Sequence, residues 1–279
     1  MANHPLPETA LLSLDGVRYE IRHINSFIHL DEPDIDESHI HNSYELYINV
    51  SGDVSFLVEN RLYPIRSGDA VMTRPGEMHL CVYHNACIHE HFCLWIDMPE
   101  GSTLLSFLHK PGFNNLYSPD NGTRQQMLDL LYRLNKLSQQ NGRELGRTVC
   151  FLQLLSLFNN QTEPESKSRD TMPDELQQML NYLNEHFREI QHVREMCDLF
   201  FISQSSINRL FRKYIHLSPR EFLESKKLAC AQQLLASDRT VTQVCQQCGF
   251  VDCSHFIAVY KKKFGETPYQ YKMSHKNKL

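Results

Sequence analysis

The sequence predicts a two-domain α+β protein, in which a small β-barrel and two further helices precede an all-α domain with two helix-turn-helix units. Residues 17–97 alternate between apolar and polar side chains as strands do, whereas residues 173–279 repeat apolar side chains at helical spacing. Residues 159–170, between the two halves, are polar, charged and without apolar period. A length of 279 residues is ample for two separate cores.

These patterns set the expected boundaries: barrel 1–120, helical segment 121–160, linker 161–172 and all-α domain 173–279. Asp174 is expected to cap the first helix of the last domain. Within the helical segment, residues 124–137 and 145–158 are amphipathic. One apolar face is expected to cover the barrel, and another to pack either on a second chain or within this one.

Residues 240–271 have the pattern of a helix, a tight turn and a second helix. Val241, Val244 and Cys245 form the apolar face of the first helix, and Gly249 supplies a turn residue that tolerates positive φ. A second helix that meets the first at a steep angle can lie in the major groove of duplex DNA. The pattern therefore predicts a DNA partner.

A similar unit precedes this one. Ser203 is placed to cap a helix that buries Ile207 and Phe211, and Phe256 and Tyr260 follow these two residues at an offset of 49. Residues 219–236 between the units have apolar side chains at helical spacing and are expected to form a rigid strut. Such a strut would place two recognition helices about 34 Å apart on one face of B-DNA.

These units resemble the AraC/XylS family of bacterial transcription regulators over roughly the last hundred residues. The motifs that carry the resemblance are Arg209-Leu210-Phe211-Arg212-Lys213, Lys227-Leu228-Ala229-Cys230-Ala231, Gly249-Phe250 and Phe264-Gly265-Glu266-Thr267-Pro268-Tyr269-Gln270-Tyr271. It implies a sequence-specific regulator, expected to be an activator rather than an enzyme, with no catalytic residues. Expected partners are promoter DNA, a small-molecule effector, RNA polymerase and a second copy of the chain. The sequence departs from the family pattern at His216, Lys227 and Ala258.

The candidate DNA contacts differ between the two recognition helices. The first offers Asn, Gln and Arg, which suit base edges, whereas basic residues near the helix ends suit phosphate. The second offers few bidentate groups and is expected mainly to hold phosphate. The full set is Ser203, Gln204, Ser205, Asn208, Arg209, Arg212, Lys213, Cys253, Ser254, His255, Lys261, Lys262 and Lys263. Each basic residue could instead belong to a solvated helix face.

Charge and cysteine content agree with a regulator in a reducing compartment. From residue 172 onward there are 15 Lys and Arg against 11 Asp and Glu, whereas residues 1–171 hold 13 against 22. The basic half is thus the half with the DNA motif. The chain has neither an 18-residue apolar stretch nor a signal-peptide pattern at its start, so we expect a cytoplasmic protein. The nine cysteines fit buried thiols, although Cys245-x-x-Cys248 with Cys253 also permits a metal or redox site.

In the front half, His39, His41 and Glu45, then Gly52, then Pro75-Gly76-x-x-His79 resemble the two cupin motifs. Members of the family often carry such a barrel as their effector domain. The resemblance implies a possible divalent transition metal on His39, His41, Glu45 and His79. Tyr83 stands where the motif usually has Asn, and regulatory cupins often keep part of the pattern without metal, so no cofactor is required.

Without metal, the same strands could line an effector pocket. The candidate residues are His41, Glu45, Tyr47, His79, His91 and Trp95. Carboxylate and aromatic groups together suit a polar metabolite such as a sugar. If Phe92, Leu94 and Ile96 face inward instead, His91 and Trp95 on the same strand face outward and cannot line the pocket. Two other functions stay open: a metal-dependent cupin enzyme or metal sensor with an added DNA-binding module, and a constitutive regulator whose barrel only dimerises.

Overall fold

The computed structural model describes residues 16–29, 41–99, 102–159 and 172–276. The predicted linker 161–172 lies outside these ranges except for Met172, and His39 lies outside them. The strands of the front domain are β1 (Arg18–Phe27), β2 (Tyr44–Ser51), β3 (Val54–Val58), β4 (Arg61–Ile65), β5 (Ala70–Thr73), β6 (His79–Tyr83), β7 (Ile88–Asp97) and β8 (Leu116–Tyr117).

These strands form two antiparallel sheets that enclose a common interior. One sheet has the order β1-β7-β2-β5-β8 and the other the order β4-β3-β6. In the pairing of β2 with β7, Tyr47 lies opposite Cys93. Both residues belong to a buried cluster that includes Phe56 of β3 and Cys81 of β6, so the inner faces of the two sheets meet. The fold agrees with the β-rich front domain that the sequence predicts.

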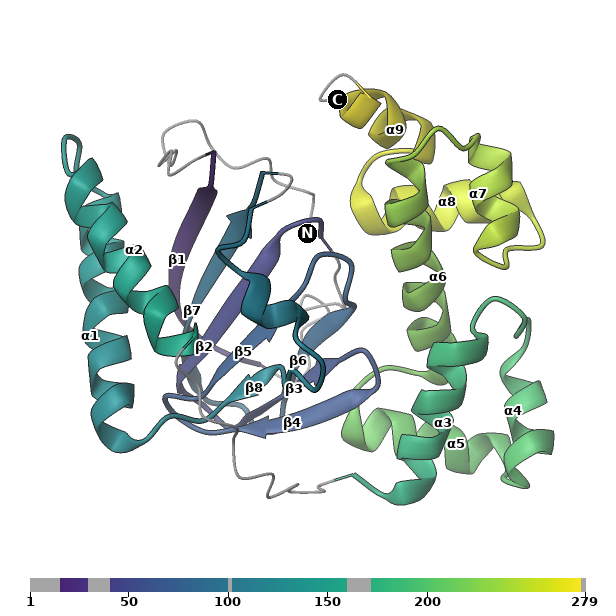
Figure 1. The fold of residues 1–279 in the computed structure, drawn as a ribbon. Helices are drawn as coiled ribbons and strands as arrows, with labels where there is room; N and C mark the ends of the chain where they lie inside the picture. The colour runs from purple at the N-terminus through teal and green to yellow at the C-terminus, as the bar shows by residue number, and fades with distance from the viewer. Residues whose placement is uncertain (1–15, 30–40, 100–101, 160–171, 277–279) are drawn as a thin grey trace.

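Two helices, α1 (Asn121–Ser138) and α2 (Glu144–Asn159), cover the outer face of the five-stranded sheet (Figure 1). Phe92, Leu94 and Ile96 share one buried cluster with apolar residues of both helices, such as Leu131 and Leu154. This face of β7 therefore points away from the barrel interior, and the opposite face points inward. A 3-10 helix, η2 (Ser106–His109), lies between β7 and β8 in the chain.

The second domain is helical throughout the described residues that follow Pro173. Its helices are α3 (Asp174–His186), α4 (Val193–Phe200), α5 (Gln204–Tyr214), α6 (Pro219–Leu235), α7 (Val241–Gln247), α8 (Cys253–Phe264) and α9 (Pro268–Lys276). Helix α6 runs between α4-α5 and α7-α8 as the predicted strut (Figure 1). The prediction that Asp174 caps α3 was wrong, because Pro173 is the N-cap residue and Asp174 is the first helical residue.

The two domains are in direct contact. Leu57, Leu80 and Val82, on the outer face of the three-stranded sheet, belong to the same buried cluster as apolar residues of α3 and α6, such as Met179 and Leu223. Polar contacts surround this apolar contact: Gln177 donates to the Asn60 carbonyl over 2.7 Å, and Gln233 to that of Gly76 over 3.0 Å. None of the helices within the described ranges has the length and apolarity needed to cross a membrane.

Candidate DNA-binding surface and effector site

The first helix-turn-helix unit is formed by α4 and α5. Helix α4 is followed by its C-cap residue Phe201, which has a left-handed φ of 52° although it is not glycine. Ser203 then caps α5, because its side chain accepts from the backbone N–H of Ser206. Ile207 and Phe211 are fully buried, as predicted. The opposite face of α5 is therefore left at the surface.

The second unit is formed by α7 and α8. Gly249 has the expected positive φ, at 77°. A Cβ at this residue would lie 2.1 Å from the carbonyl oxygen of Arg188, so the turn excludes any side chain. Asp252 caps α8 by accepting from the N–H of Ser254, and Phe256 and Tyr260 are fully buried. The two recognition helices thus use the same internal packing at a spacing of 49 residues.

Most of the predicted DNA contacts lie exposed on these two helices. Cys253 and Lys263 are partly buried, and Cys253 packs against the helical core. The exposed residues are Ser203, Gln204, Ser205, Asn208, Arg209, Arg212, Lys213, Ser254, His255, Lys261 and Lys262. Neither recognition helix is covered by the front domain on this face, so both are open to a duplex.

Some of these candidates have partners that limit their reach. Arg212 forms a 3.2 Å ion pair with Glu221 and donates to the His216 carbonyl, which holds it near the α5-α6 turn. His216, which stands where the family usually has glycine, has a φ of 61°. His255 lies 3.8 Å from Glu224 of the strut. Arg212 is therefore better placed for phosphate than for a base edge.

Sequence reasoning missed two exposed apolar residues beside the recognition helices. Phe201 is 95% exposed in the turn before α5, and Val251 is 84% exposed in the turn before α8. Apolar side chains are common in a periodic pattern, so nothing in the sequence distinguishes these two from buried neighbours such as Phe250. The left-handed backbone at Phe201, which accompanies the exposure of its side chain, is seen only in the structure.

The cysteine pattern near the second unit is explained by packing. Cys245 and Cys248 are fully buried in the helical core. Among the described residues, a group of three potential metal ligands converges only at His41, Glu45 and His79. The described part of the chain thus gives no support to a metal on Cys245, Cys248 and Cys253.

The predicted pocket residues come together inside the front domain. Glu45 lies opposite Trp95 in the register of β2 and β7, and Tyr47 stacks on His91 with ring centroids 5.1 Å apart. His79 enters from β6 of the other sheet and is fully buried. All six candidates therefore lie in one cluster between the sheets, which we call the barrel cluster: His41, Glu45, Tyr47, His79, His91 and Trp95.

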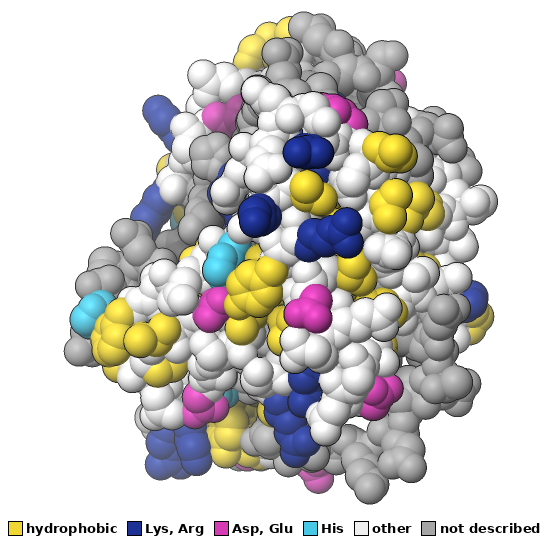
Figure 2. Space-filling model, turned by 90° about the vertical axis from the view of Figure 1, so that its left-hand side faces the viewer, with side chains coloured by type: hydrophobic (Ala, Val, Ile, Leu, Met, Phe, Trp, Pro, Cys, Tyr) yellow, Lys and Arg dark blue, Asp and Glu magenta, His cyan; other side chains and the backbone are white. Residues whose placement is uncertain are grey.

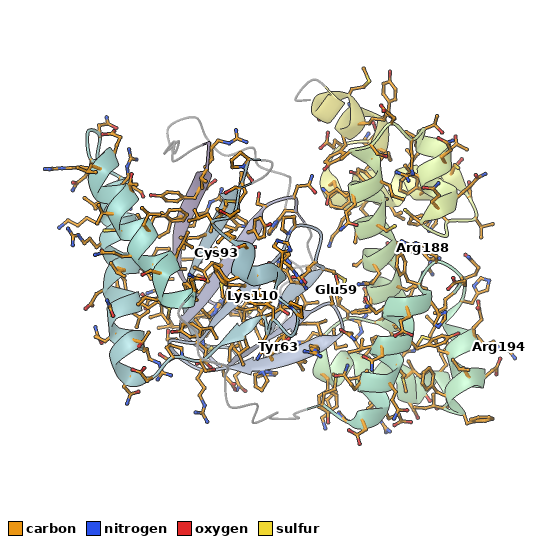
Figure 3. All side chains as sticks on the ribbon, in the orientation of Figure 1. Glu59, Tyr63, Cys93, Lys110, Arg188 and Arg194 are labelled. Carbon is orange, nitrogen blue, oxygen red and sulfur yellow. The ribbon has the colours of Figure 1, made fainter. Side chains whose placement is uncertain are left out.

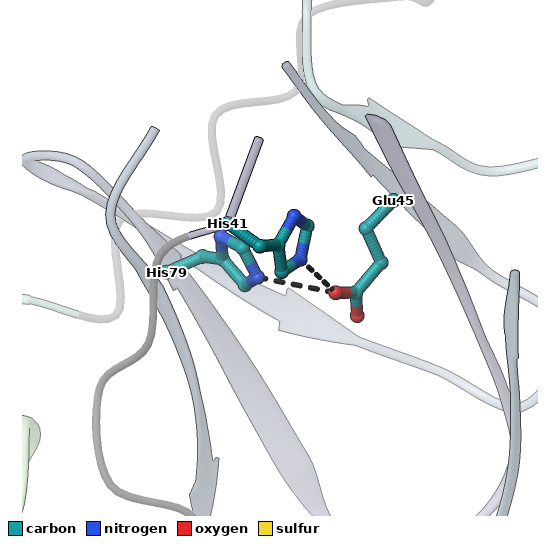
Figure 4. A group of neighbouring side chains, drawn as sticks. All are labelled: His41, Glu45 and His79. Carbon is teal, nitrogen blue, oxygen red and sulfur yellow. Dashed lines mark hydrogen bonds and ion pairs between the residues drawn. The ribbon is translucent and has the colours of Figure 1, made fainter. Parts of the chain in front are cut away.

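Glu45 is the centre of this cluster, and its carboxylate is only 3% exposed. Its Oε2 atom lies 2.7 Å from Nε2 of His41 and 3.2 Å from Nε2 of His79 (Figure 4). The indole N–H of Trp95 donates to the same oxygen over 2.9 Å. Three strands and the segment before β2 thus hold one buried carboxylate.

The orientation of the two imidazoles fits a cation at this point. Nδ1 of His41 lies 2.8 Å from the Ser43 carbonyl, and Nδ1 of His79 lies 2.8 Å from that of Glu77. Because a carbonyl only accepts, each Nδ1 carries a proton, and Nε2 then either carries a second proton, which it donates to Glu45, or presents a lone pair. In the second state, two lone pairs and a carboxylate oxygen are aimed at one point where a cation would sit, with ligand atoms within 4.8 Å of one another. Backbone hydrogen bonds of this kind commonly orient metal-binding histidines.

Further polar groups lie between the two sheets beside the barrel cluster. Tyr47 hydroxyl and Nε2 of His89 are 2.8 Å apart, and His89 stacks on His91 with centroids 4.5 Å apart. Burial, with a smaller effect of His89, lowers the pKa of His91 to about 3, so this ring is neutral at physiological pH. Cys81, which also contacts Tyr47 here, was not among the predicted site residues.

Comparisons with known proteins agree with both halves of this arrangement. Residues 27–155 match the AraC-like ligand binding domain family, and residues 196–274 match a helix-turn-helix domain family. The HTH-type transcriptional activator RhaS of Escherichia fergusonii is 27% identical over 241 residues, which cover 82% of this chain and 85% of that protein. RhaS of Salmonella arizonae is 26% identical over the same shares.

Among solved structures, ToxT of Vibrio cholerae O395 is 13% identical and covers 93% of this chain and 98% of its own, with a TM-score of 0.37. Because that score is low, the assignment depends on the two domain matches and the RhaS sequences. They match the two domains in the order in which the structure places them. The chain therefore belongs to the AraC/XylS family of helix-turn-helix transcriptional regulators.

Proposed function

We propose that this protein activates transcription at promoters that its two recognition helices bind together, under the control of a small molecule in the barrel cluster. The name of the RhaS relatives supports the activator role. In this proposal the protein acts in the cytoplasm, contacts RNA polymerase and catalyses no reaction. The observation that carries the proposal is the pair of exposed recognition helices, α5 and α8, toward the two ends of α6 (Figure 1).

Capture of genomic fragments by the purified protein, followed by sequencing, tests the DNA-binding part. We expect a shared motif with two half-sites whose centres are about one helical turn apart. Gel-shift titration on the captured duplex should then show a preference over a shuffled duplex of about a thousandfold or more. Equal affinity for both duplexes would contradict the proposal.

The residues of the barrel cluster favour a small polar effector. A buried carboxylate, an indole and several imidazoles offer hydrogen bonds and flat apolar surface, which sugars and similar polyols need. A panel of monosaccharides should include one that raises the melting temperature, because a ligand that binds only the folded state stabilises it. Glu45→Gln should abolish this shift. If no member of a broad metabolite panel shifts the wild-type protein, the constitutive alternative is favoured.

A second candidate function is metal sensing, which the convergence of Nε2 of His41, Nε2 of His79 and Glu45 favours. These three residues would hold a divalent transition metal, which would act as a Lewis acid toward a bound oxygen ligand. Metal analysis of the purified protein tests this function. We expect one equivalent of metal in wild-type protein, loss in His41→Ala, and retention in the control His109→Ala, whose ring is exposed. A metal-free wild-type protein that regains none on dialysis would exclude it.

The outer surface of α1 and α2 is proposed as a dimer contact. Figure 2 views the molecule from this side and shows apolar side chains among charged ones. Leu145 is 78% exposed, Val149 43% and Tyr132 42%. Light scattering should give twice the chain mass for wild type and for the control Ile88→Glu, which changes a residue that is 62% exposed elsewhere. Leu145→Glu should give the monomer mass; an unchanged mass would place the dimer contact on another surface.

A further inference from the structure

Helix α6 carries two adjacent buried lysines, Lys226 and Lys227, which are 5% and 6% exposed. Lysine is rarely buried to this extent unless its ammonium group has specific partners, because removing the charge from water is costly. The two side chains have different partners. Lys226 bonds to the front domain, and Lys227 bonds to both DNA-binding units.

Lys226 forms an ion pair with Glu59, which lies in the turn between β3 and β4. Figure 3 shows Glu59 at the side of the front domain that faces α6. The other carboxylate oxygen of Glu59 accepts from the backbone N–H of Met78 over 2.7 Å. Met78 immediately precedes His79 of the barrel cluster. One short chain of contacts thus connects the barrel cluster with the strut.

Lys227 donates to the carbonyl of Ile190 over 2.8 Å and to that of Gly249 over 2.7 Å. Ile190 precedes α4 in the first unit, and Gly249 is the turn residue of the second unit. One ammonium group therefore holds the loops of both units against the same turn of the strut. Burial lowers the pKa of Lys227 below its ordinary value, whereas the charges of nearby Glu195 and Cys248 act in the opposite direction. The ring of Phe250 also lies 5.8 Å from the ammonium group.

The segment before β2 makes a second connection between the barrel cluster and the helical domain. Asn42, next to His41, donates to the hydroxyl of Tyr271 in α9 over 2.9 Å. The carbonyl of His41 accepts from the N–H of Gly76, whose own carbonyl accepts from Gln233 of α6. Both histidines that face Glu45 are therefore within a few bonds of a contact to the DNA-binding domain.

We propose that Lys226 and Lys227 are positioning residues for DNA binding: Lys227 sets the relative placement of α5 and α8, and Lys226 makes that placement depend on the front domain. The proposal rests on the proposed function, since it assumes that both recognition helices bind one duplex. The two side chains leave α6 at successive residues, and in this proposal a change at the ion pair with Glu59 moves this turn of α6 relative to the Ile190 and Gly249 carbonyls. Such a displacement changes the spacing of the units without altering the face that either presents to DNA.

The test compares a captured duplex with two half-sites and duplexes in which one half-site is shuffled. Joining two sites on one rigid protein raises affinity by a factor of about 10² or more when the spacing matches. For Lys227→Met we expect this ratio of full-site to half-site affinity to fall about tenfold, while each half-site affinity stays within about twofold of wild type. The control Lys110→Met removes an exposed charge between η2 and β8 and should leave the ratio unchanged.

A merely structural role of Lys227 would lower the two half-site affinities as well, which would overturn the proposal. Where Lys227→Met does not fold, Lys227→Gln retains a hydrogen-bond donor and is measured in its place. Failure of the proposed function would give a different result from failure of the Lys227 proposal, because the wild-type protein itself would then bind no duplex with sequence preference.

Lys226 is tested with its partner by a double-mutant cycle. Glu59→Gln, Lys226→Met and the double variant should all lower the ratio of full-site to half-site affinity by the same factor, because each removes the same ion pair. Glu185→Gln, an exposed carboxylate on α3, is the control. Additive effects of Glu59→Gln and Lys226→Met, or a ratio equal to wild type in all three variants, would contradict the role of Lys226.

Discussion

Replacement of Gly249 by alanine is the sharpest test of how the second helix-turn-helix unit is built. The turn needs glycine for two separate reasons. Its φ of 77° is unfavourable for any residue with a Cβ, and that Cβ would lie 2.1 Å from the carbonyl oxygen of Arg188. Gly265, the C-cap of α8, has nearly the same φ of 76° but no atom within 4 Å of its Cβ position. It is therefore a matched control for the first reason alone.

The expected magnitudes follow from these two contributions. A left-handed conformation costs a non-glycine residue about 1–2 kcal/mol, which is the whole expected loss for Gly265→Ala. At Gly249 the clash is with backbone, which must move, and overpacking of this kind costs about 1–3 kcal/mol more. The expected loss for Gly249→Ala is thus about 2–5 kcal/mol, against a total stability of about 5–15 kcal/mol for an ordinary domain.

Urea unfolding of both variants measures these losses, and gel-shift titration on the two half-site duplexes measures their effect on DNA binding. The Arg188 carbonyl belongs to the loop that follows α3, so displacement of the Gly249 turn should change how α8 sits on the protein. We expect Gly249→Ala to lose affinity for one half-site and keep it for the other. Equal losses of stability for the alanine variants of Gly249 and Gly265 would show that the contact with Arg188 does not constrain the turn.

Three further predictions concern DNA contacts and pH. Arg209→Ala should lose about 1–3 kcal/mol of binding free energy on the captured site and relax the preference at one base. Lys262→Ala should weaken binding to all sequences and make the affinity less dependent on salt concentration. A binding-site selection with both variants tests this difference. The hydroxyl of Tyr132 and the ring of His23 lower the pKa of the Glu90 carboxyl below its ordinary value of 4.5. The ionised Glu90 should therefore stabilise the folded protein fully above pH 4.5, and this stabilisation should be lost as the pH falls through the lower pKa of the folded state. Acid unfolding of Glu90→Gln should lack this component, and an acid transition identical to that of wild type would count against it.

The elements with strong local signals could be predicted from the sequence. The apolar spacing around Ile207, Phe211, Phe256 and Tyr260 requires only helix geometry, and all four are fully buried. Gly249 was predicted from its place between two helices, and its φ agrees. The sequence did not decide whether the face of β7 with His91 and Trp95, or the face with Phe92 and Leu94, points inward. Alternation defines the two faces of a strand but not which of them faces the interior. Packing of α1 and α2 on Phe92 and Leu94 decides the choice.

Contacts between distant segments could not be predicted in the same way. Lys227 was noted as part of a family motif and as a departure from it, but its bonds to Ile190 and Gly249 depend on how the two units pack around α6. The contact of Leu57 and Leu80 with the helical domain could not be predicted either. Apolar residues in a strand indicate that the strand is buried, but not which element covers it. Of the predicted metal ligands, the described residues include His41, Glu45 and His79, which the structure brings together as a group.

The central claim is that α5 and α8 enter successive major-groove segments on one face of a duplex. Hydroxyl-radical and base-methylation footprinting of the wild-type protein on a captured duplex measures this most directly. We expect two protected major-groove segments, centred about one helical turn apart. Shuffling one half-site should remove its own segment and raise the protein concentration needed to protect the other. A single protected segment, or two on opposite faces of the duplex, would contradict it.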